Sequence, residues 1–153
     1  EMVYSVEGFL SMMFNNKGNT YRDKLVLNVM SENISRVSFQ YPGDSSYNLV
    51  KNNNVWLINN SVADSAEVQN YLNSIAQLSS YEFIDNINLS QPYCSLKIEG
   101  NNFLPVNIVA YPADTIHKFF ITSSLNKGAV FSGGKNNLFE QVFAGPGKFI
   151  VKE

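Results

Sequence analysis

The chain has few of the residues that most often carry chemistry. Its 153 residues include one cysteine, Cys94, and one histidine, His117. A single cysteine excludes a disulfide within the chain and a metal site built from several thiolates. We therefore expect no metal site and no cofactor. A lone thiol fits either a reducing cytosol or an exported protein without disulfides.

Charged residues are also scarce, at 16%, and the formal net charge is −2 at pH 7. The lysines and arginines are scattered and form no basic stripe of the kind that neutralises phosphates, so we expect no nucleic-acid partner. The apolar cluster at residues 9–14 is far shorter than the roughly 20 residues that a membrane-spanning helix requires. We therefore expect no membrane span in this chain.

Hydrophobic residues make up 44% of the chain, which is enough to bury a core. Alternating apolar residues indicate short strands in two groups, one on each side of a helical segment. The first group is residues 25–29, 37–41, 47–50 and 55–58, and the second is residues 94–98, 106–110, 118–122 and 129–131. Each group predicts an antiparallel meander, because turn-forming residues separate its strands.

The hydrophobic period changes to that of a helix in two places. After Asp64, apolar residues recur at the spacing of one helical face, and Glu67 lies at the capping-box distance. This pattern predicts a helix near residues 64–78 that begins at Asp64. A second helix is predicted near residues 137–144, with Asn137 as its N-cap. Meanders and helices together predict an α+β fold.

The same turn chemistry occurs at residues 41–44 and at residues 111–114. Four strands followed by a helix then occur twice, which favours an internal repeat of two tandem meander-plus-helix units. The alternation of the two halves is only partly in phase, so a true duplication stays open. We expect one compact body made of an N-terminal segment at 1–20, a first unit at 21–84 and a second unit at 85–153.

A succession of spaced patterns resembles one protein family. The patterns lie at residues 21–27, 34–39, 47–49, 55–58, 63–65 and 91–96. Together they resemble the bacterial envelope family called domain of unknown function 4340, over approximately residues 21 to 151. The resemblance implies an α+β protein that is tethered or exported at the cell envelope, often beside transporter or gliding-type membrane machinery. It implies no catalytic residues.

The chain begins at Glu1 rather than Met, so we expect a preceding signal or anchor segment to have been removed. With the resemblance, this predicts a location at the bacterial cell envelope, either periplasmic or lipid-anchored. We also expect a protein partner there, whose identity and stoichiometry the residues do not give. The resemblance implies that many similar proteins carry a membrane anchor, and we expect none in this sequence.

An enzymatic alternative can be written from Asp114, His117 and Ser123, which lie close together in the sequence. The residues around Ser123 lack the glycines of a nucleophile elbow, so a histidine held by local hydrogen bonds is the favoured interpretation. The sequence therefore predicts a non-enzymatic binding or scaffolding module, accessory to a membrane transporter-type complex. A small hydrolase or small-molecule-binding protein is the alternative.

Trp56 and Ile58 share one face of a strand whose other face is also apolar. This pattern favours burial of both side chains, and it leaves an interaction surface formed by Trp56 and Ile58 as the other option.

Three further motifs predict structure rather than chemistry. Cys94 alternates with apolar residues and is expected in the core. Residues 133–135 lack the first glycine and the Ser or Thr of a phosphate loop. Residues 85–88 place isoleucine where a calcium loop needs an oxygen ligand.

Overall fold

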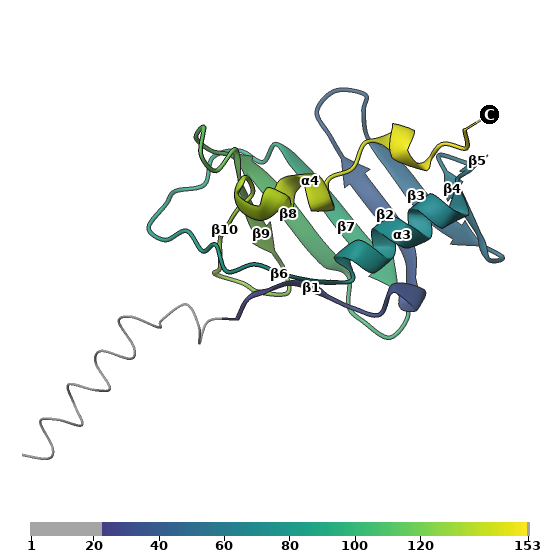
Figure 1. Cartoon of the computed structure of the whole chain (residues 1–153), viewed down its shortest axis with the longest axis horizontal. Helices are drawn as coiled ribbons and strands as arrows, with labels where there is room; N and C mark the ends of the chain where they lie inside the picture. The colour runs from purple at the N-terminus through teal and green to yellow at the C-terminus, as the bar shows by residue number, and fades with distance from the viewer. Residues whose placement is uncertain (1–22, 153) are drawn as a thin grey trace, which may run out of the picture.

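The computed structural model describes residues 23–152, which form one antiparallel sheet of eight strands and a separate two-stranded sheet. The large sheet has the order β10-β9-β8-β7-β2-β3-β4-β5. Its strands are β2 (Ile34–Gln40), β3 (Tyr47–Asn52), β4 (Val55–Ile58), β5 (Ser61–Val62), β7 (Cys94–Gly100), β8 (Val106–Pro112), β9 (Phe119–Ser123) and β10 (Phe131–Ser132). Helices α3 (Ser65–Ile75) and α4 (Leu138–Val142) lie across one face of it (Figure 1). The α+β prediction is confirmed.

The small sheet pairs β1 (Leu25–Asn28) with β6 (Gln77–Ser79), and a 3-10 turn, η1 (Ser31–Asn33), connects β1 to β2. The prediction that the strand near 25–29 opens the first meander is wrong. The fourth strand of that run is β5 instead. Val26 and Leu27 are adjacent in the chain and both are fully buried. Because adjacent residues of a strand point to opposite faces, both faces of β1 are covered.

Two four-stranded runs, β2 to β5 and β7 to β10, join side by side through antiparallel pairing of β2 with β7. The turn at residues 41–44 follows β2, whereas the matching residues 111–114 begin within the last two residues of β8. These strands do not hold equivalent positions, because β2 is the first strand of its run and β8 is the second of its own. The tandem repeat therefore stays a prediction.

Helix α3 begins where the sequence predicts. The Asp64 carboxylate accepts the N–H groups of Ala66 and Glu67 at 3.1 and 3.2 Å, which confirms Asp64 as the N-cap. The helix buries Val68, Tyr71, Leu72 and Ile75. It ends earlier than the predicted residue 78, because residues 77–79 pair with β1 as β6.

The C-terminal region differs more from prediction. Helix α4 follows a 3-10 turn, η2 (Lys135–Asn137), and Asn137 has a left-handed φ of 54° with no capping hydrogen bond from its side chain. Asn137 therefore holds the predicted N-cap position, but its side chain does not cap the helix. The apolar run at residues 149–151 predicts a closing strand, but the structure has a 3-10 turn there, η3 (Pro146–Phe149), followed by a single bridge between Ile150 and Ala63.

The two faces of the large sheet differ in burial. Every second side chain of its central strands lies beneath the helices and is fully buried, as with Val37, Phe39, Leu49, Leu96, Ile98, Ile108 and Ile121. The intervening side chains, such as Arg36 and Lys97, lie on the opposite face. Among residues 23–152 no helix covers that face (Figure 1).

Candidate functional site

The structure separates the residues of the enzymatic alternative. His117 precedes β9 and Ser123 ends it, so they lie at opposite ends of that strand, roughly 20 Å apart at about 3.3 Å per residue. The Asp114 carboxylate accepts the N–H groups of Ile116 and His117, at 3.0 and 2.7 Å, and so closes a turn. The three side chains do not come together.

His117 and Ser123 each have a local partner. The Nδ1 atom of His117 lies 2.8 Å from the hydroxyl oxygen of Ser132, which is fully buried. The hydroxyl of Ser123 donates to the carbonyl of Val26 at 2.6 Å and joins β9 to β1. The interpretation of His117 as a locally bonded histidine is confirmed, and Ser123 is a buried connection between strands.

Cys94 lies in the core at the start of β7, with 3% of its surface exposed. Burial raises the pKa of its thiol to about 12. The thiol is therefore protonated at neutral pH and is a poor nucleophile.

Gly133 and Gly134 are explained by close packing. A Cβ atom at Gly133 would lie 2.8 Å from the carbonyl oxygen of Phe119, and one at Gly134 would lie 2.6 Å from that of Ile116. Side chains at these positions would clash with the backbone. Within residues 23–152, no group of three or more His, Cys, Asp or Glu side chains is placed to hold a metal ion.

Trp56 and Ile58 are buried beneath the helical layer, with exposed fractions of 3% and 7%. The burial that the strand pattern favours is confirmed. It leaves little of either side chain for a partner to contact.

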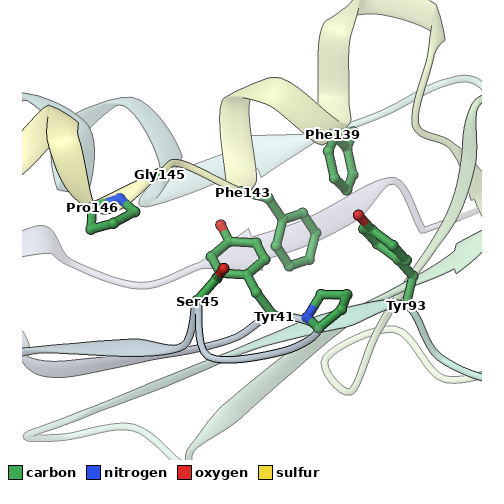
Figure 2. Close-up of a pocket in the computed structure, with 8 residues that line it drawn as sticks. Tyr41, Ser45, Tyr93, Phe139, Phe143, Gly145 and Pro146 are labelled. Atoms are coloured by element: carbon green, nitrogen blue, oxygen red, sulfur yellow. The ribbon is translucent and has the colours of Figure 1, made fainter.

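An aromatic pocket opens on the helical side of the sheet, where four chain segments meet (Figure 2). The segments are the β2–β3 turn, the residue before β7, helix α4 and the link from α4 to η3. The aromatic pocket has a volume of about 360 Å³ and is lined by Tyr41, Pro42, Ser45, Tyr93, Phe139, Phe143, Gly145 and Pro146.

The rings of the pocket form a continuous wall. Phe139 stacks on Phe119 with ring centres 4.1 Å apart, and Tyr93 lies 5.0 Å from the same Phe119 ring. Phe143 stacks on Phe139 at 5.0 Å and meets Tyr41 edge-on at 6.4 Å. In Figure 2, Phe139 and Phe143 project from α4 toward Tyr93 and Tyr41. Such offset and edge-on contacts stabilise aromatic clusters beyond their area burial.

Tyrosine hydroxyls hold the end of α4 that forms this wall. Tyr41 and Tyr47 both donate to the carbonyl oxygen of Ala144, and Tyr71 donates to that of Val142. The last carbonyls of a helix lack partners within the helix, so these bonds satisfy groups that burial would otherwise leave unpaired. Burial raises the pKa of all three phenols well above the ordinary value, so they remain donors at neutral pH.

Two hydroxyl groups of the pocket are available to form hydrogen bonds with a ligand. The hydroxyls of Tyr93 and Ser45 make no hydrogen bond to another group within residues 23–152, and Tyr93 is 45% exposed. They lie on opposite sides of the pocket (Figure 2). The arrangement can therefore pack an apolar group between ring faces and donate to a carbonyl at its rim.

The sequence model of the family described as domain of unknown function 4340 matches residues 1–93, more than half of the chain. The chain belongs to this family. Comparison with curated proteins found no match, and comparison with solved structures found none.

The family match differs in extent from the resemblance read from the sequence, which reached approximately residue 151. The matched part of this domain of unknown function 4340 chain ends at Tyr93, before β7. It contains four of the residues that line the aromatic pocket, namely Tyr41, Pro42, Ser45 and Tyr93. Within residues 23–152, no helix has the length and apolar character needed to cross a bilayer.

Sequence reasoning did not identify the pocket. The sequence pattern predicts Tyr41 and Pro42 in a turn and Phe143 in a helix. The one sequence feature that points toward an aromatic site is the large number of aromatic residues, eleven Phe and eight Tyr. No local spacing indicates which of these rings meet.

Proposed function

We propose that this chain is a non-enzymatic binding module of the bacterial cell envelope, whose aromatic pocket recognises an extended, proline-containing segment of a protein partner. The observation that carries the proposal is the meeting of ring faces with two exposed prolines in one pocket. Tyr41, Tyr93 and Phe139 supply the accessible rings, and Pro42 and Pro146 flank them.

The chemistry of the pocket suits a polyproline-type segment. Such segments leave their carbonyl groups without internal hydrogen bonds and present rigid rings that pack against aromatic side chains. The hydroxyls of Tyr93 and Ser45 supply donors for those carbonyls. A volume of about 360 Å³ admits one or two side chains rather than a folded element.

The walls of the pocket are held in place before a ligand arrives. Three tyrosine hydroxyls anchor the end of α4, and Phe143 beneath the pocket is buried. A preformed site loses less conformational entropy on binding, which favours recognition of a short segment.

The envelope setting rests on family membership and on what the resemblance implies about similar proteins. We infer that the partner belongs to a membrane transporter-type complex for the same reason. The hydrolase alternative has no support in the geometry, because Asp114, His117 and Ser123 lie apart and each side chain is used in local structure.

Titration of the labelled full chain, followed by NMR chemical shifts, tests the proposal. The probe is an acetylated proline-rich peptide, and its control is the same peptide with alanine at each proline. We expect saturable shifts at Tyr41, Tyr93 and Phe139 with the first peptide and none with the second.

Variants localise the binding. Tyr93→Ala is expected to weaken binding about tenfold, because exposed aromatic side chains dominate such contacts. Tyr81→Ala is the matched control, since Tyr81 is also exposed but lies outside the pocket. Equal responses to the two peptides, or equal effects of the two variants, would contradict the proposal.

A further inference from the structure

A second concave site lies on the uncovered face of the sheet, away from the aromatic pocket. This asparagine hollow has a volume of about 470 Å³ and is lined by Arg36, Asn48, Val50, Lys51, Asn52, Leu57, Asn59 and Asn60. Val50 and Leu57 alternate with buried residues of β3 and β4, so their side chains are on the face opposite the helices.

The strand register places a cation beside an aliphatic surface. Arg36 of β2 pairs with Val50 of β3, and Val50 pairs with Leu57 of β4. Paired residues share a face, so the guanidinium group and the two aliphatic side chains form one row across three strands.

The guanidinium group of Arg36 is only partly neutralised. Its Nε atom lies 3.8 Å from a carboxylate oxygen of Glu99, while Lys97 approaches the other oxygen more closely, at 3.4 Å. The Glu99 carboxylate therefore pairs with two cations, and the three side chains together carry a net positive charge. The Arg36 side chain is 52% exposed, and its terminal N–H groups have no hydrogen-bond partner within residues 23–152.

Asn59 adds a second donor to the lining of the hollow. The backbone N–H of Asn48 donates to the side chain of Asn59 at 3.1 Å. In return, the backbone N–H of Asn59 donates to the carbonyl oxygen of Asn48 at 3.2 Å. A backbone N–H can only donate, so the atom facing it is the carboxamide oxygen, and the amide nitrogen is left with both of its protons. The hollow therefore offers donors from Arg36 and Asn59 around an apolar floor.

We propose that the asparagine hollow binds the C-terminal carboxylate of a peptide that ends in an aliphatic residue. Arg36 and Asn59 donate to the carboxylate, because a guanidinium group pairs with both oxygens of a carboxylate and an amide supplies a further N–H. The aliphatic side chain packs on Val50 and Leu57. This site is on the opposite face of the sheet from the aromatic pocket. A result for one site therefore does not decide the proposal for the other.

The test is an NMR titration of the full chain with N-acetylleucine. We expect saturable shifts at Val50, Leu57 and Asn59. N-acetylleucine amide, which lacks the charge, and glucuronate, which lacks the aliphatic group, are the comparison probes and should shift these residues little. Shifts as large with the amide would overturn the carboxylate assignment, and tighter binding of glucuronate would overturn the aliphatic one.

Variants of the donors complete the test. Arg36→Gln is expected to raise the dissociation constant of N-acetylleucine about tenfold, through loss of a charge-assisted bidentate contact. Asn59→Gly removes the carboxamide and keeps the left-handed φ of 46° accessible, and it should weaken binding several-fold. Lys127→Gln removes the same charge at a position outside the asparagine hollow and should have no effect. Unchanged affinity in Arg36→Gln, with native spectra, would refute the site.

Discussion

Tyr41 and Tyr47 donate their hydroxyls to one acceptor, the carbonyl oxygen of Ala144, each at 2.6 Å. One tyrosine lies just after β2 and the other begins β3, so two neighbouring parts of the sheet hold the same point beyond α4. A carbonyl oxygen has two lone pairs and can accept both bonds. This shared acceptor connects the sheet to the helical wall of the aromatic pocket.

The shared acceptor predicts non-additive losses of stability. Tyr47→Phe keeps the ring that stacks on Phe39 and removes one donor, and Tyr41 still satisfies Ala144, so we expect a loss of about 1 kcal/mol. The double variant with Tyr41→Phe leaves the carbonyl without a partner. It should lose more than the sum of the single changes, by about 1 kcal/mol or more. Urea unfolding of the four proteins measures this, and simple additivity would show that the two bonds are independent.

The same phenols predict how stability depends on pH. Burial raises the pKa of Tyr41 and Tyr47 above 10.0 and that of the Cys94 thiol from 9.0 to about 12, so folding favours the protonated forms. Their contribution is complete below the unfolded pKa values and is lost as the pH rises above them. Urea midpoints should therefore fall from about pH 9 upward, and they should fall less in the double Tyr→Phe variant. An equal fall in both proteins would assign the effect to other groups.

The face of α3 predicts a large difference between two neighbouring substitutions. Leu72 is fully buried, so Leu72→Ala should lower the free energy of unfolding by about 2–5 kcal/mol. Gln69 bonds only to Asn73 at the surface, and Gln69→Ala should cost about 0.5 kcal/mol or less. The two unfolding midpoints in urea decide this. Closely similar midpoints would mean that the buried face has been misassigned.

The structural role of Ser123 can be measured apart from any activity. Ser123→Ala removes the donor to the buried carbonyl of Val26, with an expected loss of about 1–3 kcal/mol. Ser90→Ala, at an exposed position of the connector before β7, is the control and should change little. Stability of Ser123→Ala equal to that of the control would remove the proposed link between β9 and β1.

The sequence predicts those elements whose signals are local. The start of α3 follows from Asp64 and Glu67, and most strands follow from their alternation. Strand β6 was missed because Leu78 continues the helical period, and only its pairing with β1, distant in the chain, makes this segment extended. Strand β5 has two residues, too few to show alternation.

The aromatic pocket has no local signature for a similar reason. Tyr41, Tyr93 and Phe139 are separated by long stretches of sequence, and each one also fits an ordinary place in a turn, a connector or a helix. The sheet order and the docking of α4 bring them together. Both depend on pairing and burial across the whole domain, which the spacing of residues does not contain.

Recognition of an extended proline-containing segment by the aromatic pocket is the main proposal for this chain. Intermolecular NOEs between the full chain and the bound proline-rich peptide test it most directly, because they report distances between peptide and protein protons. We predict NOEs from the peptide's proline ring protons to the ring protons of Tyr41, Tyr93 and Phe139. A peptide that does not bind, or that binds with NOEs only to residues outside the pocket, would contradict the claim.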